Sequence, residues 1–308
     1  MISEGTQDDR SRRLRVLVAG STGYLGRYVV SELHARRHIV RALVRDPVRL
    51  GPVRGCVTEV FVGQATEHAS LEGVADGVDC IISCLGNRTF NRKPTVWEVD
   101  RDANLNLVER AQAAEISRFI FVSVLAGRQT RSRVPQIEAR EQVVDALTQG
   151  PVPWTIIRPA GFFNDMVEFL DMAAKGTAWL VGKGDSRFAP IHGADLATYI
   201  VDRLEDDAAE AREFPVSGPE LLTQREIAEL AFSALNQPSR IKTTPDWLVP
   251  MLAKLVIPFN VNMGSFLAML AAMAGEQDTA AVSTGEHFLA DFFREQLASA
   301  DRDLRARR

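Results

Sequence analysis

Lysine, tyrosine and cysteine are scarce in this sequence. Its 308 residues include only five lysines and three tyrosines, so most of its basic side chains are arginines. These short lists restrict every catalytic scheme that needs a tyrosine or a lysine. The three cysteines, Cys56, Cys80 and Cys84, are an odd number at spacings unlike those of a zinc site. We therefore expect reduced thiols, with neither a disulfide framework nor a bound metal.

The charge pattern gives no sign of a nucleic-acid partner. The formal net charge is −4, and no long stretch concentrates the arginines into the basic face that phosphate binding requires. Residues 1–13 are polar and lack the apolar core of a signal peptide, so we expect a disordered lead-in and a cytoplasmic protein. The length and the 46% content of hydrophobic residues are enough for one enlarged domain or two joined ones.

A glycine-rich turn follows the first predicted strand. The apolar run LRVLVAG, which starts at Leu14, leads directly into a segment with helical periodicity. Three glycines at G-x-x-G-x-x-G spacing separate the two, as in a dinucleotide-binding turn whose helix N-terminus faces the pyrophosphate. The residues predicted to contact the cofactor here are Gly20, Ser21, Thr22, Gly23, Tyr24, Leu25 and Gly26.

The end of the second predicted strand, residues 38–44, bears on which dinucleotide is bound. Arg45 follows that strand, where an arginine suits the 2′-phosphate of NADP and an acidic residue suits the free ribose hydroxyl of NAD. We expect NADP(H) to be preferred over NAD(H), while the adjacent Asp46 keeps NAD as the alternative.

Further apolar strands alternate with helices along the chain. Strands are predicted at 57–63, 78–84 and 118–123, with a short helix around 71–74 and a long one over 96–114. This pattern predicts an α/β fold with a doubly wound parallel sheet, in which ligands bind at the carboxyl ends of the strands. Those ends carry further predicted cofactor contacts: Gly63, Gln64, Cys84, Leu85, Gly86, Asn87, Ser123 and Val124.

Several segments together resemble one protein superfamily. They are VLVAGSTGYLGRYVVSEL, ALVRDP, DCIISCLG, ISRFIFVSVLAG, VPWTIIRPAGFFNDM, APIHGADLA and FPVSGPELLTQREIAELA. Their order is similar to that of the atypical short-chain dehydrogenase/reductase superfamily, in its NmrA-like and divinyl-chlorophyllide-reductase-like branch, from about residue 14 to 235. The resemblance implies a Rossmann domain at 14–160, NADP(H) as cofactor, and a smaller, mainly helical substrate-capping portion at 161–308 that is interleaved with the last Rossmann elements.

The sequence departs from this superfamily at its catalytic pair. Many members use Tyr-x-x-x-Lys, in which the tyrosine donates a proton and the lysine holds the nicotinamide ribose. No such pair occurs here, and the matching segment has Gln136 in the tyrosine place and Arg140 in the lysine place. Arginine stays charged at physiological pH, so Arg140 can hold a ribose hydroxyl or polarise a carbonyl but cannot exchange protons. We predict this orienting role for Arg140 and a similar one for Ser123.

A sixth strand is expected in the segment VPWTIIRPAGFFNDM, and the loop that follows it is expected to line the nicotinamide. Its predicted cofactor contacts are Pro159, Ala160, Gly161 and Phe162, and the substrate contacts that follow are Phe163, Asp165 and Met166. Farther along, we expect His192 to be structural and Asp195 to act as a helix N-cap or a loop anchor.

An uncharged stretch occupies residues 255–275. Its length would suit a membrane span, but prolines, asparagines and glycine in its first half favour two short helices instead. We expect Met263 and Phe266 to line an apolar substrate pocket there. A simple core patch is the alternative, and shallow membrane attachment is a third interpretation.

The sequence therefore predicts an NADPH-dependent reductase. It would pass hydride to a carbonyl or an activated double bond of a bulky, apolar or polycyclic small molecule, with positioning more important than acid catalysis. The main alternative is a non-catalytic NADP-binding sensor or regulator of NmrA-like type, and an isomerase or lyase with a structural nucleotide is the other. Substrate, stereochemistry and oligomeric state are not indicated.

Overall fold

One parallel sheet of eight strands organises the computed structural model, which describes residues 13–273 and 281–306. The strand order is β12-β9-β6-β5-β4-β1-β2-β3, and each neighbouring pair is parallel. The strands are β1 (Arg15–Ala19), β2 (Ile39–Val44), β3 (Glu59–Val62), β4 (Cys80–Ser83), β5 (Arg118–Val122), β6 (Trp154–Pro159), β9 (Arg212–Ser217) and β12 (Val282–Ser283). The order reverses between β1 and β4, so the doubly wound α/β prediction is confirmed.

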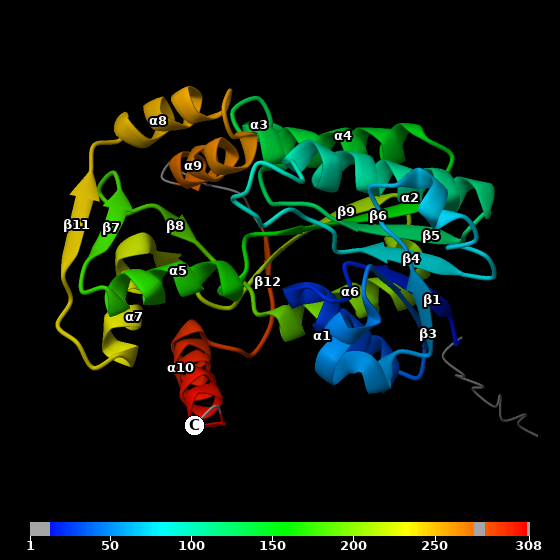
Figure 1. Ribbon diagram of the computed structural model, residues 1–308, viewed down its shortest axis with the longest axis horizontal. Coiled ribbons are helices and arrows are strands. Elements are labelled where there is room, and N and C mark those ends of the chain that lie inside the picture. Colours follow the sequence, from blue (N-terminus) through cyan, green and yellow to red (C-terminus); the bar gives the residue numbers. More distant parts are fainter. Residues whose placement is uncertain (1–12, 274–280, 307–308) are drawn as a thin grey trace, which may run out of the picture.

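Helices cover both faces of this sheet (Figure 1), with α1 and α6 on one face and α2 and α4 on the other. They are α1 (Tyr24–Ala35), α2 (Ala103–Ala113), α3 (Gly127–Thr130), α4 (Pro135–Gln149) and α6 (Gly193–Glu205), and the short helical turns are η1 (Pro47–Cys56), η2 (His68–Leu71), η3 (Trp97–Asp102) and η4 (Asp207–Ala209). Because neither face meets solvent, central strands such as β4 and β5 are buried at every residue.

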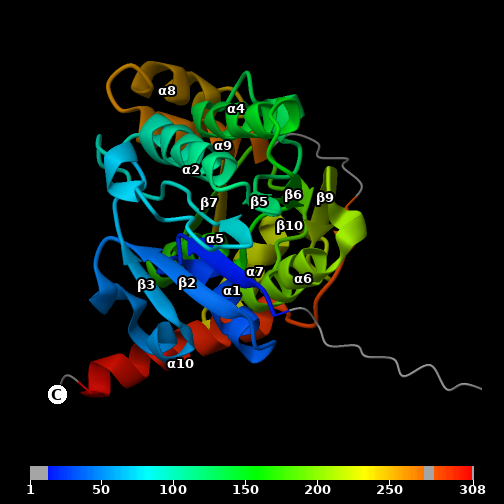
Figure 2. The same cartoon turned by 90° about the vertical axis from the view of Figure 1, so that its right-hand side faces the viewer.

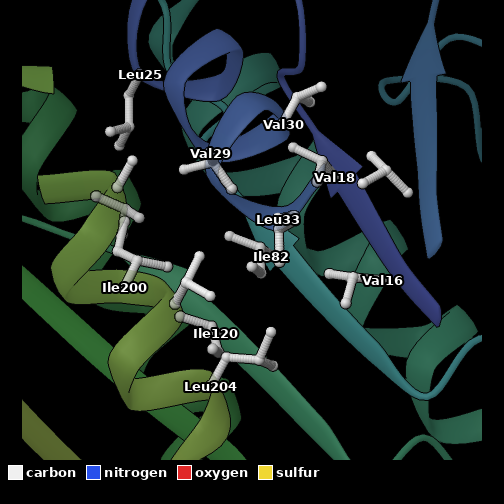
Figure 3. Close-up of a cluster of buried hydrophobic side chains, with 14 of the residues drawn as sticks. Val16, Val18, Leu25, Val29, Val30, Leu33, Ile82, Ile120, Ile200 and Leu204 are labelled. Atoms are coloured by element: carbon white, nitrogen blue, oxygen red, sulfur yellow. The ribbon is translucent and has the colours of Figure 1, made fainter. Parts of the chain in front are cut away.

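The two cores follow from the two-residue period of a strand. In β1, Val16 and Val18 point to the face where they pack with Leu33 of α1, as Figure 3 shows. Leu17 points the other way and packs with Leu107 of α2. A one-residue shift of β1 would exchange these sets, so the apolar residues on both sides fix its register.

A smaller portion lies beside the sheet and is mainly helical (Figures 1 and 2). Its elements are α5 (Phe163–Ala174), α7 (Gln224–Ala234), α8 (Leu248–Val256), α9 (Val261–Met273) and α10 (Leu289–Ala306), with the paired strands β7 (Ala178–Val181) and β11 (Ile241–Thr244), and β8 (Arg187–Phe188) and β10 (Leu222–Thr223). It has its own core, which includes Phe232 and Phe293. A Thr223–Glu226 capping box opens α7.

Some predicted boundaries differ from the structure. The helix expected over 96–114 begins as the π-helix η3 and becomes α-helical only at α2, and the helix expected around 71–74 is the 3-10 turn η2. Within the described part of the uncharged stretch only α9 is a complete helix, because α8 begins earlier, at Leu248, and ends at Val256; the prediction of two short helices inside the stretch is therefore wrong. The last two residues of the stretch lie outside the described residues. So do residues 1–12 of the predicted lead-in. Among the described residues, no helix combines the length and apolarity that crossing a membrane would need.

We predict that Gly26→Ala destabilises the protein because α1 packs tightly on the turn before it. A Cβ at Gly26 would lie 2.1 Å from the carbonyl oxygen of Gly20. The backbone must move to relieve this overlap, which should lower the free energy of unfolding by about 1–3 kcal/mol in denaturant titration. Gly55→Ala is the matched control, since a Cβ there meets nothing within 4 Å. Equal stability of the two variants would contradict the packing argument.

Candidate functional site

The glycine-rich turn meets the loop after β4 at the carboxyl edge of the sheet. Gly20 has φ +81°, a conformation that favours glycine, and a Cβ on it would lie 2.9 Å from the carbonyl oxygen of Cys84. The same position is 3.2 Å from the amide nitrogen of Leu85. The turn therefore lies at the point between β1 and β4 where the strand order reverses, which is where such sheets bind ligands.

The turn leaves helix donors free for an anion. The N-cap of α1 is Gly23, which has no side chain to cap the helix, so the first amides of α1 lack an internal partner. Ser21 is fully buried, and its hydroxyl donates to the carbonyl of Leu43 at 3.2 Å, which joins the turn to β2. A pyrophosphate is the kind of group that this arrangement can bind.

The end of β2 presents an exposed arginine. Arg45 is exposed, while the carboxylate of Asp46 accepts a 3.0 Å bond from the amide of Val48 as the N-cap of η1. Gly63 is adjacent, since its amide donates to the carbonyl of Val44 at 2.9 Å, and Gln64 follows it. The predicted contacts for the adenosine half are thus together at one end of the edge.

A buried ion pair underlies the other half of the edge. Arg140 of α4 donates to Asp100 of η3 at 2.7 Å, and the Asp100 side chain is fully buried. The same guanidinium donates to the carbonyls of Leu85, at 3.1 Å, and Val122. One arginine therefore joins the carboxyl ends of β4 and β5 to η3.

Gln136 belongs to the same network. Its amide nitrogen donates to the carbonyl of Asn87 at 2.9 Å and to Asp100 at 3.2 Å. Burial raises the pKa of Asp100, and the nearby Arg140 guanidinium opposes that rise. The two residues that replace tyrosine and lysine are therefore side by side and bind the cleft wall. Asp100 was missed in the sequence because nothing in its segment marks it as different from the acids around it.

A second buried ion pair lies beneath Ser123. Glu141, the residue after Arg140, has a fully buried side chain and accepts from Arg158 of β6 at 2.6 Å. The hydroxyl of Ser123 donates to the same carboxylate at 3.1 Å, and Arg158 donates to the carbonyl of Val124 at 3.1 Å. In this structure the Ser123 hydroxyl thus faces the interior network.

Aromatic and histidine rings surround the far side of the turn. The Tyr24 hydroxyl accepts from the amide of Gly193 at 3.0 Å, and its ring lies 6.4 Å from that of Phe162. Burial raises the pKa of Tyr24, so its phenol stays protonated. His192 stacks on His287 with ring centroids 4.1 Å apart, and burial lowers the pKa of His192 to about 4.

The structure corrects one capping assignment here. The N-cap of α6 is His192, whose ring accepts from the amide of Ala194 at 3.3 Å, and Asp195 lies in the first turn. Asp195 instead accepts from the amide and ring of His287 at 3.2 and 2.7 Å, so the N-cap prediction for it is wrong and the loop-anchor prediction is confirmed.

An ion pair that the sequence did not predict joins two loops at this edge. Arg88, in the loop after β4, donates to Asp165 in the first turn of α5 at 2.7 Å. Both side chains are about half exposed. Asp165, one of the predicted substrate residues, is therefore held by a partner that lies far away in the sequence.

The other predicted substrate residues lie in different surroundings. Phe163 and Met166 are 1% and 2% exposed and pack in the core of the smaller portion. Met263 and Phe266 are on α9, and the Phe266 ring lies 5.0 Å from that of Phe90, in the loop after β4. Phe266 of α9 therefore contacts the loop after β4, whereas the side chains of Phe163 and Met166 are buried away from that loop.

A cavity of about 280 Å³ opens beside the loops that follow β5 and β6. Its walls are mostly small or apolar, and its one charged side chain is Arg187. The lining residues are Leu125, Ala160, Arg187, Phe188, Ala189, Ser217, Gly218, Pro219, Leu221, Ala281 and Ser283. Leu125 and Ala160 each follow a predicted cofactor contact, so this cavity adjoins the predicted nicotinamide position.

Comparison with known proteins supplies a family. A family model described as NAD(P)H-binding matches residues 20–207. The chain is 26% identical over 234 residues to the photosystem II assembly factor Ycf39 of Synechocystis sp., covering 75% of this chain and 71% of that protein. It is 27% identical over 266 residues to the chloroplastic divinyl chlorophyllide a 8-vinyl-reductase of Oryza sativa subsp. indica, covering 78% of this chain and 65% of that protein.

Solved structures agree on the fold. The NADPH-dependent quinone oxidoreductase QOR2 of Escherichia coli, complexed with NADPH, superposes with a TM-score of 0.73 at 16% identity, over 92% of this chain and 99% of that one. The resemblance to the divinyl-chlorophyllide-reductase-like branch is confirmed by the family model and by these relatives, and the solved structure confirms the fold.

We predict that Asp100→Asn is strongly destabilising. It leaves the buried Arg140 without its counter-charge, which should cost about 3–5 kcal/mol of unfolding free energy. Asp102→Asn is the control on the same helical segment, because Asp102 pairs with Arg101 at a side-chain exposure of 42%. Its loss should stay within about 1 kcal/mol. If chemical denaturation gave both variants the same midpoint, the buried pair would not be the support that we describe.

Proposed function

The chain belongs to the NAD(P)H-binding family, and from this we propose that it is an NADPH-dependent reductase of a bulky, apolar or polycyclic small molecule. The observation that carries the proposal is the Gly20–Gly26 turn packed against the loop after β4 at the switch point of the sheet. The glycines of this turn let its backbone approach a pyrophosphate closely.

The residues at the edge fit a dinucleotide along its whole length. The uncapped N-terminus of α1 can bind the pyrophosphate. The loop residues Cys84–Asn87, Ser123–Val124 and Pro159–Phe162 would line the nicotinamide half, since they follow β4, β5 and β6. Gly63 and Gln64 would lie beside the adenosine half.

Preference for NADP is supported at the end of β2. Arg45 is exposed and forms no ion pair with any described residue, so its guanidinium is available for a 2′-phosphate. Asp46, the group that could favour NAD, already accepts a backbone hydrogen bond as the cap of η1.

Arg140 and Ser123 serve this reaction as positioning residues. Arg140 holds the carbonyls of Leu85 and Val122 at the predicted nicotinamide wall, and Asp100 keeps its guanidinium in place. Ser123 is held by Glu141 in the same way. Both are thereby removed from proton exchange, in keeping with a site that lacks Tyr-x-x-x-Lys.

When bound, NADPH supplies hydride to a carbonyl or an activated double bond. The chain's own part is to orient the substrate and to exclude water, and the proton comes from solvent or from the substrate itself. The cavity beside Leu125 and Ala160 supports an apolar substrate. We propose that Asp165, Met263 and Phe266 contact this substrate. The rice relative is named as a reductase of a vinyl group on divinyl chlorophyllide, which is a substrate of this bulky class.

We also propose a division of the chain into two portions. Residues 14–160 would form the cofactor domain, and residues 161–308 would cap the substrate while returning α6, β9 and β12 to the sheet. We place the protein in the cytoplasm.

A non-catalytic NADP sensor or regulator is the second candidate. The contacts of Gln136 and Arg140 favour it, because both side chains bind the protein itself where many relatives have an acid–base pair. The relative Ycf39 is named as an assembly factor and not as an enzyme.

An activity assay separates these two candidates. We expect the purified protein to consume NADPH, followed by its absorbance, with at least one member of a panel of quinones, enones and aromatic ketones. Gly26→Ala should abolish this consumption and Gly55→Ala should keep it, since only the first forces the backbone of the glycine-rich turn to move. Tight NADPH binding without consumption across the whole panel would favour the sensor.

Arg45→Ala should change the cofactor preference. We expect NADPH to bind about tenfold or more weakly by titration calorimetry, because a charge-assisted contact to the 2′-phosphate is lost, while NADH affinity stays the same. Arg54→Ala is the control: it lies near the end of η1, where its guanidinium binds the carbonyl of Val57 at 3.3 Å. Equal weakening of NADPH and NADH by Arg45→Ala would refute the assigned role.

A further inference from the structure

Helix α8 turns an apolar face outward. Trp247, immediately before it, is 63% exposed, and Leu255 and Phe259 are 59% and 74% exposed. Met251 and Leu252 are 41% and 38% exposed. The spacing of Met251, Leu252 and Leu255 places them on one side of α8, and Trp247 and Phe259 flank its two ends. We call these five residues the α8 face.

The opposite side of α8 packs against the rest of the protein. Ala253 is 2% exposed and packs in a small cluster with Ala268 of α9 and Ile137 of α4. Figures 1 and 2 both place α8 at the outside of the molecule, beyond α9. The α8 face therefore takes no part in the core, and no segment among the described residues covers it.

This concentration of exposed apolar side chains is unusual for the molecule. Elsewhere in the described residues, large exposed apolar side chains such as Val48 occur mostly singly, which is ordinary for a protein surface. Phe90, which is 46% exposed, adds to the α8 face, because its carbonyl accepts from Asn260 next to Phe259 at 2.8 Å. A contiguous apolar patch marks a surface that binds something.

The charges around the patch indicate what it binds. Between Asp246 and Glu276 the sequence has a single charged residue, Lys254, which is exposed on α8. Arg92 is exposed in the loop that carries Phe90, and neither cation forms an ion pair within residues 13–273 and 281–306. The carboxylate of Asp246 is directed at Gly182. The patch thus has two cations without an ion-pair partner, while the nearby acids are the exposed Asp246, beside Gly182, and Glu98, which is paired with Lys93. This local excess of cations contrasts with the net charge of −4 of the whole chain.

We propose that the α8 face, with Phe90, Lys254 and Arg92, docks on the surface of a lipid bilayer that contains anionic headgroups. The aliphatic and aromatic side chains enter the boundary between headgroups and acyl chains. Trp247 and Phe259, at the two ends of the face, suit that depth, and the two cations contact lipid phosphates. A second copy of this chain suits the patch less well, because a symmetric contact between two α8 faces would bring two Lys254 side chains together without an acid.

Docking would place the bilayer close to the loop after β4. Helix α9, which supports α8, is anchored to the loop after β4, since Asn262 accepts from the amide of Val96 at 2.9 Å and donates to the carbonyl of Pro94 at 2.8 Å. Ser265 accepts from the amide of Gln136 at 2.9 Å. The surface stands on its own observations and is independent of the proposed reductase activity.

Vesicle co-sedimentation with the full chain tests the proposal. We expect wild-type protein to sediment with vesicles of phosphatidylcholine and phosphatidylglycerol. Leu252→Glu combined with Leu255→Glu should reduce the partition coefficient about tenfold or more, because two carboxylates enter the apolar layer. Lys254→Glu should weaken binding to these vesicles about fivefold and leave binding to pure phosphatidylcholine unchanged.

Two controls keep the result interpretable. Val48→Glu puts the same charge at an isolated exposed apolar residue and should leave sedimentation unchanged. Because the altered side chains point outward, all variants should keep the wild-type unfolding midpoint and NADPH affinity. Wild-type protein that stays in the supernatant with both vesicles overturns the proposal. The proposal would also be overturned if the wild-type protein self-associated and the double variant Leu252→Glu with Leu255→Glu did not. The α8 face would then bind a second copy of the chain.

Discussion

Two adjacent residues of opposite charge on α4 join the carboxyl ends of β4, β5 and β6. Arg140 reaches toward β4, β5 and Asp100, while Glu141 reaches toward Ser123 and Arg158. Neighbouring residues on a helix point about 100° apart, so one turn of α4 can tie the carboxyl ends of three parallel strands. Each charge is buried, and each is stable only because its partner is in place.

This arrangement explains how the fold can lack its usual catalytic pair and still keep the shape of the site. In relatives with Tyr-x-x-x-Lys, those two positions face the reaction. Here Gln136 and Arg140 occupy them and bind Asn87, Leu85 and Asp100. In this chain the two side chains therefore join the loop after β4 to η3 and cannot act as an acid–base pair. A reductase built this way depends on orientation and a dry surface, and the same geometry also suits a protein that only senses its cofactor.

Much of the frame could be predicted because its signals are local. The glycine spacing, the apolar strands and the arginine after β2 each depend on residues within one short segment. The partners of the site could not be predicted in this way. Asp100 is one of several acids in its helix, and only its burial beside Arg140 distinguishes it. Arg88 and Asp165 lie in distant segments of the sequence. Phe163 has the sequence context of a ligand-binding residue, and only its packing in the smaller core shows that it is buried.

The sequence by itself determined the doubly wound sheet, the glycine-rich turn and the absence of a Tyr-x-x-x-Lys pair, because periodicity, glycine spacing and residue counts do not depend on distant contacts. The tertiary structure decided which charges are paired, which aromatic side chains face the cleft and which face of α8 is left in solvent. Those outcomes depend on desolvation and on competition between distant segments for the same space, and neither is encoded in any single stretch of the chain.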